Sequence, residues 1–461
     1  MSVRTDEYDL IVVGAGMAGM NAAGRAAATG ARVAVLERGR VGGTCPTRGC
    51  IPTKALIRSA EIAKEIARAE EFGIRVGDVY VDFAAVMERV ELIIDRGSRG
   101  AQGYLESLEG VDLVLGEASL EDATSVRVGD RVLGAPRIIL ATGAEPSIPP
   151  IEGLEEAGYL TSDSLLRLRA LPRRLLVIGG GPIALELGQA LQRLGAQVTI
   201  VEVLPRLLPS AEPELAEALE GYLADDGMTV LVNTQIERVE RSPSGASRML
   251  VTRDGVERWL EGDELLVATG RRPATGRLDL ERAGIDHTGR GIAVDARLRT
   301  NQISVWAAGD VLGLPYGAFT HVARRQGVSV AENAFDLQAH DVNPDVGPTA
   351  IFTDPELVSV GMTEESAEAA GYDVRIGTSS FSGGKARAWG EERGMVKVIT
   401  DAATRRILGA HVLAYHGADL IHPILVAMQT GDGTGEPIRR AYHVHPTFGE
   451  VVKSAVEQTL A

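Results

Sequence analysis

The chain has little of several residue types, and each shortage excludes a class of protein. It holds two cysteines in 461 residues, too few for a small secreted domain built on disulfides. No apolar run approaches the ~18 residues that a membrane span requires. The net charge of −16 argues against nucleic acid and anionic membranes as partners. The N-terminus, MSVRTDEYDL, carries acidic residues where a signal peptide needs an apolar segment, so we expect a cytoplasmic protein.

Lysine is also scarce, with five lysines among 47 basic residues. One of the five, Lys54, closes the stretch GGTCPTRGCIPTK, which also contains both cysteines, Cys45 and Cys50. This clustering of rare residue types marks the stretch as a candidate site. The 45% hydrophobic fraction and the length are those of a globular protein of two to four domains.

The first part of the chain contains a βαβ unit. The sequence YDLIVVGAGMAGMNAAGRAAATGARVAVLE predicts a strand, a helix and a second strand at residues 8–13, 17–29 and 32–36. Gly14 makes the tight turn, Gly16 admits a pyrophosphate and Gly19 allows close packing of helix and strand. The helix N-terminus attracts the anion, and Glu37 can bond a ribose hydroxyl. The unit therefore predicts dinucleotide binding.

The same pattern recurs at residues 173–202, RRLLVIGGGPIALELGQALQRLGAQVTIVE. Its loop is Gly179-x-Gly181-x-x-Ala184, and Glu202 ends the second strand. Two dinucleotide sites in one chain suggest that electrons pass between two cofactors, and the intact glycines argue against a degenerate copy.

Two further strands end in Ala-Thr-Gly, RIILATGAEP with Thr142 and Gly143, and LLVATGRRPA with Gly270. We expect them where the chain crosses between nucleotide domains. A third strand ends at Gly309 and Asp310, whose carboxylate is expected to face a bound hydroxyl chain, and a helix is expected at residues 320–335.

From residue 349 the sequence predicts short strands, a hairpin at residues 394–413 and an amphipathic helix at residues 418–430. The expected fold class is α/β, with two Rossmann-like domains and a C-terminal α+β dimerisation domain. The predicted domains are residues 1–146 with 275–345 for the first dinucleotide, 147–274 for the second, and 346–461 for subunit contact.

Together these motifs resemble the FAD-dependent pyridine nucleotide-disulfide oxidoreductases of class I, over essentially the whole chain. The most specific signal is GGTCPTRGCIPTK, which is similar to the redox-active cysteine motif of that family. Two cysteines without further Cys or His neighbours do not make a metal site, which needs about four ligands. A small, accessible loop disulfide is readily reduced, and Pro46 and Gly49 are expected to break the helix so that the sulfurs can meet.

The resemblance implies that the first nucleotide domain binds FAD and the second binds NAD(P), and it also implies roles for individual residues. Cys50 lies against the flavin, Cys45 exchanges with the substrate, and Lys54 pairs with Glu186 near the flavin. His445 is the proton-transferring base and Glu450 its partner, in the segment HVHPTFGE. In the family this histidine serves the other subunit, which implies a homodimer. Further cofactor contacts are implied at Gly43, Thr44, Gly116, Ala318 and Ile236.

Within the family, HVHPTFGE and Glu202 favour dihydrolipoyl dehydrogenase, with NADH rather than NADPH, FAD as flavin, and a lipoamide-like small dithiol or disulfide as substrate. Arg206 and Ala184 are typical of NADP-dependent members, so NADP stays open. The helix PIALELGQAL is similar to that of mercuric reductase, but no C-terminal cysteine pair is present. The alternatives are a mercuric reductase-like enzyme, another NAD(P)H-dependent disulfide reductase, and a flavin-dependent quinone reductase that does not use the cysteines.

Overall fold

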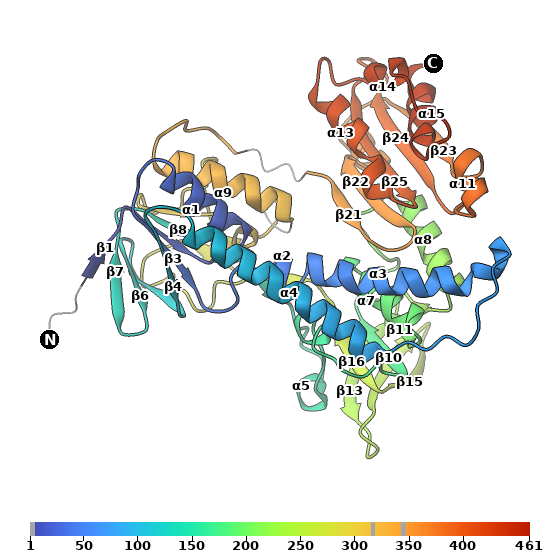
Figure 1. Ribbon diagram of the computed structural model, residues 1–461, viewed down its shortest axis with the longest axis horizontal. Helices are drawn as coiled ribbons and strands as arrows, with labels where there is room; N and C mark the ends of the chain where they lie inside the picture. The colour runs from blue at the N-terminus through green and yellow to red at the C-terminus, as the bar shows by residue number, and fades with distance from the viewer. Residues whose placement is uncertain (1–4, 315–318, 343–346) are drawn as a thin grey trace.

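The computed structural model describes residues 5–314, 319–342 and 347–461; Ala318 lies outside the described residues. Three lobes surround two long helices, α3 (Cys50–Ala67) and α4 (Phe83–Glu106), which cross the centre in Figure 1. The Asp82 side chain caps α4 by accepting a hydrogen bond from the Ala85 N–H at 3.0 Å. The two helices pack against each other and so tie the lobes together.

The first lobe is built on five parallel strands in the order β20, β8, β2, β3, β4. The inner strands of this sheet are continuous apolar runs, because helices cover the sheet and bury both faces of these strands. β8 and β20 come from either side of the second nucleotide-binding unit, so two separate chain segments complete one sheet. The strands are β2 (Leu10–Val13), β3 (Val33–Glu37), β4 (Val111–Leu115), β8 (Ile138–Leu140) and β20 (Val305–Ala307).

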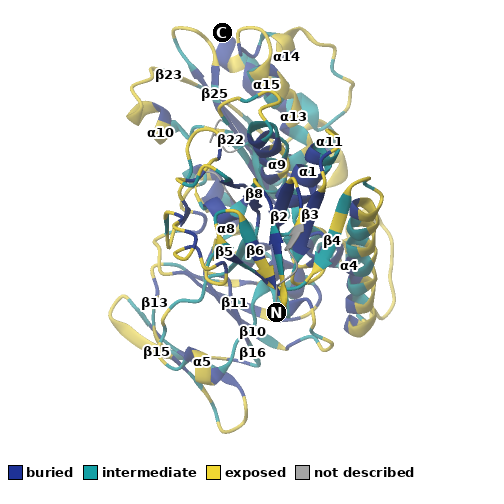
Figure 2. Cartoon of the chain, turned by 90° about the vertical axis from the view of Figure 1, so that its left-hand side faces the viewer, coloured by how far each residue is buried: buried dark blue, intermediate teal, exposed yellow. Residues whose placement is uncertain are grey.

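Two helices on this sheet make backbone contact. They are α1 (Met17–Ala27) and α9 (Thr320–Ala334), and both have dark blue, buried portions in Figure 2. A Cβ added at Gly327 of α9 would lie 2.2 Å from the Ala18 carbonyl oxygen of α1. No larger residue fits there, so the position of α9 relative to α1 is fixed.

A small four-stranded sheet, not expected from the sequence, flanks the first lobe in the order β1, β7, β6, β5. Its strands are β1 (Thr5–Glu7), β5 (Ala118–Asp122), β6 (Ser125–Val128) and β7 (Arg131–Gly134).

The second lobe repeats the Rossmann pattern, with a parallel sheet in the order β12, β11, β10, β16. The predicted strand–helix–strand unit is β10, α7, β11, and a three-stranded antiparallel sheet follows it. The elements are β10 (Arg174–Ile178), α7 (Pro182–Arg193), β11 (Gln197–Val201), α8 (Pro213–Asp225), β12 (Thr229–Leu231), β13 (Gln235–Arg241), β14 (Ser247–Arg253), β15 (Val256–Gly262) and β16 (Glu264–Val267).

The two lobes are joined by a two-stranded antiparallel ribbon. It pairs β9 (Ala144–Pro146) with β17 (Arg271–Pro273). Each strand directly follows one of the two Ala-Thr-Gly sequences, so these are the crossing points that the sequence predicts.

The C-terminal lobe is an antiparallel sheet in the order β21, β22, β25, β24, β23, as expected for an α+β domain. Helix α15 (Gly449–Leu460) packs on β23, where a Cβ at Gly377 would lie 2.0 Å from the Ala455 carbonyl oxygen. The strands are β21 (Thr349–Ile351), β22 (Glu356–Gly361), β23 (Val374–Ser380), β24 (Met395–Asp401) and β25 (Ile407–Ala414).

One predicted helix is wrong. Residues 418–430 form two helices, α12 (Gly417–Leu420) and α13 (His422–Gln429). Pro423 lies in the first turn of α13. Proline lacks an N–H and favours the start of a helix over its interior, so the helix restarts there.

A buried lysine joins the second lobe to the C-terminal lobe. The Lys397 side chain, 1% exposed, lies among three carboxylates. Its Nζ is 2.7 Å from Glu212 Oε1, 3.0 Å from Glu214 Oε1 and 2.5 Å from Glu364 Oε2. Glu212 and Glu214 are at the start of α8, whereas Lys397 is on β24 and Glu364 on α10 (Glu364–Ala369). The three carboxylates therefore form an ion-pair network around the Lys397 ammonium group.

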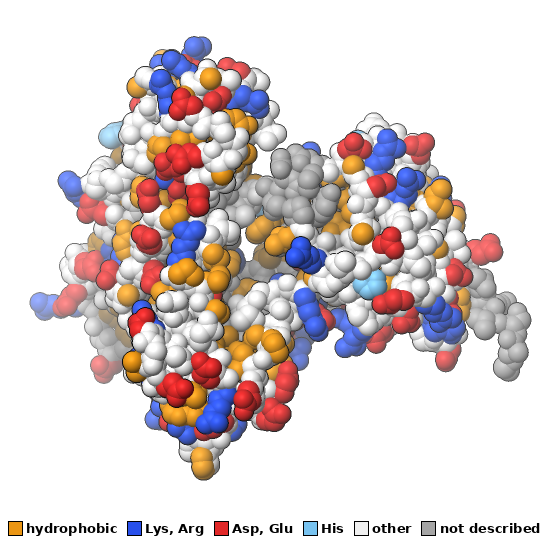
Figure 3. All heavy atoms as spheres, turned by 180° about the vertical axis from the view of Figure 1, so that it is seen from behind, with side chains coloured by type: hydrophobic (Ala, Val, Ile, Leu, Met, Phe, Trp, Pro, Cys, Tyr) orange, Lys and Arg blue, Asp and Glu red, His pale blue; other side chains and the backbone are white. Residues whose placement is uncertain are grey.

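The surface in Figure 3 carries acidic and basic side chains interspersed over the face seen from behind. The excess of acidic residues is spread over the lobes visible there. Within the described part of the chain, no helix combines the length and apolarity needed to cross a membrane.

Candidate active site

The two cysteines lie at a break between two helices. Cys45 is in α2 (Thr44–Thr47), and Cys50 begins α3. Between them Arg48 and Gly49 leave the helical conformation, with φ/ψ of −145°/0° and −138°/−110°. The expected break is present, although it falls at Arg48 and Gly49, and Pro46 stays inside α2. This fold-back lets the two sulfurs meet.

The sulfurs share a proton unequally. Both residues are free thiols in the structure, and Cys45 donates a hydrogen bond to Cys50. This bond, together with Thr320 and the Lys54 charge, lowers the pKa of Cys50 to about 6 against the opposing effect of burial. The same bond and burial raise the pKa of Cys45. At neutral pH the reduced pair is therefore a Cys50 thiolate beside a Cys45 thiol.

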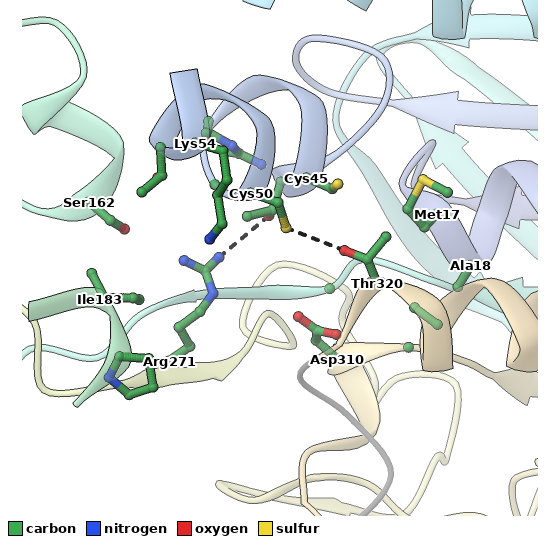
Figure 4. A pocket seen from close by; sticks show the side chains of 18 of the residues that line it. Met17, Ala18, Cys45, Cys50, Lys54, Ser162, Ile183, Arg271, Asp310 and Thr320 are labelled. Atoms are coloured by element: carbon green, nitrogen blue, oxygen red, sulfur yellow. Dashed lines mark hydrogen bonds between the residues drawn. The ribbon is translucent and has the colours of Figure 1, made fainter. Parts of the chain in front are cut away.

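A cavity of about 260 Å³ lies in front of the pair. Figure 4 shows its lining: Cys50 and Lys54 come from one wall, Thr320 and Asp310 from another, and Ile183 and Arg271 from the opposite side. Both nucleotide lobes and α3 thus contribute, so a group bound in the cavity contacts all three.

The structure brings Lys54 and Glu186 together, as the family resemblance implies. Lys54 Nζ is 2.7 Å from Glu186 Oε2. The other carboxylate oxygen, Oε1, accepts the Phe352 N–H at 3.0 Å, and Lys54 Nζ lies 4.1 Å from the centre of the Phe352 ring. These contacts link α3, the second lobe and the chain next to β21.

Arg271, which the sequence reasoning missed, projects into the same cavity. Its Nη2 donates to the Ala144 carbonyl oxygen at 2.5 Å and to Thr44 Oγ1 at 3.5 Å. Within the described chain, its buried Nε has no hydrogen-bond partner, and burial lowers its pKa. Asp163 Oδ1 is 4.0 Å from Nη1. A buried donor without a partner is costly, so the cavity suits a polar ligand.

The first glycine loop leaves no room for a side chain at Gly14 or at Gly19. A Cβ at Gly14 (φ +108°) would lie 2.3 Å from the Ala141 carbonyl oxygen, and one at Gly19 would lie 1.9 Å from the Gly14 carbonyl oxygen. A Cβ added at Gly43 (φ +68°) would lie 2.6 Å from the Cα atom of Gly16. The N-terminus of α1 begins here with no side-chain cap. This backbone cradle at a helix N-terminus fits the pyrophosphate of FAD.

Glu37 also holds this loop in shape. Its Oε2 accepts the Ala15 N–H at 2.9 Å, and its Oε1 accepts the Gly39 N–H at 2.8 Å. The Gly116 N–H donates to the Glu37 backbone oxygen at 2.8 Å. The predicted ribose-binding acid and Gly116 therefore lie together at the rim of the first site.

The predicted residues Thr142, Gly143, Gly309 and Asp310 follow the ends of β8 and β20. Thr142 Oγ1 donates to the Ala274 carbonyl oxygen at 2.9 Å. The Gly309 N–H (φ +81°) donates to Gln326 Oε1 of α9 at 2.8 Å. Parallel strand ends meet at one edge of a sheet, which is where such folds bind ligands.

The second glycine loop is built in the same way. A Cβ at Gly179 (φ +106°) would lie 2.7 Å from the Ala268 carbonyl oxygen. Glu202, 8% exposed, accepts the Gly180 N–H at 2.6 Å and the Leu204 N–H at 2.8 Å. Of the other predicted contacts, Gly181 caps α7, Ala184 is buried in α7, Ile236 is on β13, and Gly270 (φ +103°) precedes β17.

The C-terminal pair also forms. His445 Nδ1 is 3.0 Å from Glu450 Oε1, and the Thr447 N–H donates to Glu450 Oε2 at 2.9 Å. The Thr447 N–H and then His445 lower the pKa of Glu450. The imidazole is 76% exposed, and neither His445 nor Glu450 is among the described residues that line the cysteine cavity. In this single chain the pair is thus presented outward, away from that cavity's lining.

Comparisons with known proteins agree with this geometry. Residues 8–330 match the family described as pyridine nucleotide-disulphide oxidoreductase, and residues 347–456 match its dimerisation domain. The chain is 36% identical to mercuric reductase of Lysinibacillus sphaericus over 458 residues, which are 98% of this chain and 83% of that protein. It is also 36% identical to dihydrolipoyl dehydrogenase of Chlorobaculum tepidum over 463 residues, covering 98% and 97% of the two chains.

Among solved structures, the chain is similar to the HOCl-induced flavoprotein disulfide reductase RclA from Escherichia coli, determined as a Cu(II) complex. The TM-score is 0.87 at 29% identity, covering 98% of this chain and 99% of that one. Similarity of this extent includes both nucleotide lobes, the cysteine motif and the C-terminal domain. The chain therefore belongs to the pyridine nucleotide-disulphide oxidoreductase family, as an FAD-dependent oxidoreductase with NAD(P)H as electron donor, a redox-active cysteine pair and a dimerisation domain.

Proposed function

We propose that the enzyme moves electrons between NAD(H) and a small dithiol or disulfide, with dihydrolipoamide as the dithiol. The observation that carries this proposal is the Cys45–Cys50 pair at a cavity shared by both nucleotide lobes. The lowered pKa of Cys50 and the raised pKa of Cys45 support it. The chemistry supplied by bound FAD is electron transfer between the nicotinamide and the cysteine pair.

The chain's residues perform the disulfide exchange in balanced steps. A thiolate of dihydrolipoamide attacks Cys45 Sγ of the oxidised pair, and the Cys45–Cys50 bond breaks to leave the Cys50 thiolate. The second substrate sulfur, as its thiolate, then attacks the substrate sulfur of the mixed disulfide. This step releases cyclic lipoamide, and the departing Cys45 sulfur takes up the proton that the substrate thiol has lost. The cysteine pair now holds the two electrons of the substrate as the Cys50 thiolate and the Cys45 thiol. Attack on a disulfide requires the thiolate form of the nucleophile.

His445 is proposed to accept the substrate thiol proton. Glu450 orients its imidazole through the 3.0 Å contact at Nδ1, which leaves Nε2 for the proton. Because the pair is exposed and does not line this chain's own cysteine cavity, we propose that the active enzyme is a homodimer in which the partner subunit's His445 serves Cys45.

Glu202 is proposed to select NAD over NADP. The buried carboxylate sits at the end of β11, held by two backbone N–H groups. A remaining lone pair can accept ribose hydroxyls, whereas its negative charge repels a 2′-phosphate.

The deciding experiment is the steady-state rate of NAD⁺ reduction by dihydrolipoamide, with NADP⁺ measured beside it. Fast turnover with NAD⁺ alone supports the proposal and the role of Glu202. Cys45→Ser must abolish this turnover and leave NADH-dependent quinone reduction intact. Loss of both activities, or of neither, contradicts the assigned role of Cys45.

A second candidate substrate is a metal ion. It is favoured by the relatives named mercuric reductase and by the Cu(II) complex of RclA. Oxidation of NADH or NADPH that depends on Hg²⁺ or Cu²⁺ and exceeds dihydrolipoamide turnover decides for this candidate.

A further inference from the structure

Helix α9 is held rigidly next to the cysteine pair. At its middle, Gly327 is packed against the Ala18 backbone so closely that a Cβ would come within 2.2 Å of it. One residue earlier, Gln326 Oε1 accepts the Gly309 N–H at 2.8 Å. Two consecutive residues thus anchor α9 to α1 and to the end of β20. These contacts set the position of the helix that carries Thr320 as its first residue.

Thr320 directs its hydroxyl at Cys50. Figure 4 shows the two side chains pointing toward one another, with Thr320 Oγ1 3.4 Å from Cys50 Sγ, a hydrogen-bond distance for sulfur. Thr320 is also the first residue of a 15-residue helix that has no side-chain cap. The positive end of the helix dipole therefore lies on the same side of the sulfur. Both features favour a negative charge on Cys50.

Charged and titratable groups face Cys50 from the other elements around the cavity. Cys45 donates a hydrogen bond to it, and Lys54 acts through its charge. The cavity is also lined by the charged side chains of Arg48, Glu186, Arg271 and Asp310. Asp163 acts on Arg271 through its charge. Thr320 differs from these charged groups because it is neutral at every working pH and because its Oγ1 lies within hydrogen-bond distance of Cys50 Sγ. It also contacts the sulfur from the side opposite α3.

We infer that Thr320 is a positioning residue, whose hydroxyl donates to the Cys50 thiolate and keeps the negative charge of the reduced pair on Cys50. Cys45 then stays protonated as the exchanging thiol until a base takes its proton. The inference rests on the proposed function for its catalytic meaning. The hydrogen bond itself can be tested without turnover.

The test uses the purified holoprotein in a Cys45→Ser background. Only two cysteines exist in the chain, so Cys50 is then the single thiol, and the serine hydroxyl can still donate to it. The rate of alkylation by iodoacetamide, followed by intact mass as a function of pH, reports the thiolate fraction of Cys50. Thr320→Val removes the hydroxyl at nearly constant shape, and Thr320→Ser retains it. Both variants keep the N-terminus of α9 and its dipole, so they differ in the hydroxyl at residue 320.

Thr320→Val is expected to raise the alkylation pKa of Cys50 by about one unit, the size of a charge-assisted hydrogen bond. Thr320→Ser is expected to match the parent. The inference is overturned if the Cys50 thiol has the same alkylation pKa in Thr320→Val as in the parent. It is also overturned if Thr320→Ser shifts that pKa as much as Thr320→Val does. If Thr320→Val does not fold, as judged by circular dichroism and FAD content, Thr320→Ala takes its place in the comparison of Cys50 alkylation pKa values. A wild-type enzyme inactive with dihydrolipoamide overturns the proposed function but leaves this titration as a separate result.

Discussion

Glu186 contacts Lys54 and the backbone of Phe352 with different oxygens, so one carboxylate joins α3, the second nucleotide lobe and the C-terminal lobe. The Glu186 side chain is 9% exposed, and the Lys54 side chain is 31% exposed. A buried carboxylate needs its cation, because the unpaired charge is costly. The pair therefore fixes where α7 stands against the cysteine helix.

Glu186→Gln is expected to slow flavin reduction by NADH at least tenfold, which corresponds to about 1.4 kcal/mol in the barrier. The amide keeps a hydrogen bond to Phe352 but not the attraction for Lys54. Stopped-flow absorbance measures this rate. The matched control is Glu61→Gln, which breaks an exposed pair with Arg58 on the same helix and should change the rate little. Equal rates in both variants would show that the Lys54–Glu186 charge pair has no part in the step.

Gly14→Ala is expected to give a protein that no longer retains FAD. The added Cβ would lie 2.3 Å from the Ala141 carbonyl oxygen, at φ +108°, so the phosphate loop must move. The ratio of flavin to protein after purification is the measurement. The control, Gly103→Ala on α4, meets nothing within 4 Å and is expected to keep FAD. It should also gain roughly 0.5 kcal/mol of stability from helix propensity. Full flavin content in Gly14→Ala would show that the loop tolerates a side chain.

Lys397→Met is expected to destabilise the protein by about 3–5 kcal/mol, because it leaves Glu212, 2% exposed, as a buried unpaired carboxylate. A fall in thermal midpoint and earlier loss of C-terminal lobe structure are the readouts. Lys453→Met removes an exposed i,i+4 pair with Glu457 on α15 and should cost no more than about 0.5 kcal/mol. A midpoint for Lys397→Met close to that of Lys453→Met would argue against the network as a joint between lobes.

Glu356 is expected to make the protein less stable as pH rises. Burial raises the pKa of Glu356 to about 7, well above that of an exposed glutamate, and the charges of Asp419, Glu61 and Asp354 add to the effect. The folded state then holds a proton that the unfolded state has lost. The free energy of unfolding therefore falls across the interval between the two pKa values.

Glu356→Gln removes this dependence, since an amide mimics the protonated acid and can still accept the Ala418 N–H. Near pH 8 the variant should be more stable than the parent by on the order of 1–3 kcal/mol, and near pH 4.5 about equal. Thermal midpoints at both pH values are the measurement, with the exposed Glu365→Gln on α10 as control. A gain that is the same at both pH values would contradict the assignment.

Local patterns were enough to predict the two nucleotide-binding units. The expected strands at residues 8–13 and 32–36 correspond to β2 (Leu10–Val13) and β3 (Val33–Glu37). The reason is physical: the glycine loop, the flanking apolar runs and the terminal acid all act within about 30 residues of chain. The Lys54–Glu186 and His445–Glu450 contacts were expected only from the family resemblance, since spacing alone does not indicate either pair.

Contacts between distant segments could not be predicted in this way. Thr320 is 270 residues from Cys50, and Arg271 is 227 residues from Thr44. Each residue type is ordinary in isolation, and only the packing of α9 on α1 and the crossing ribbon brings them to the cavity. The split at α13 is different, because Pro423 was visible in the sequence. An amphipathic pattern that continued through it outweighed the missing N–H.

The β9–β17 ribbon means that the chain leaves and re-enters the first lobe at adjacent points. Pro146 and Arg271 are opposite each other in register, so the intervening 147–270 segment forms a closed excursion. Antiparallel neighbours can be joined by a two-residue turn. The second lobe is thus an insertion in the topology of the first lobe. A short turn between β9 and β17 would leave the order of the strands in the first sheet unchanged. The flavin-side sheet therefore acquires its last strand, β20, only after residues 147–270 have been synthesised.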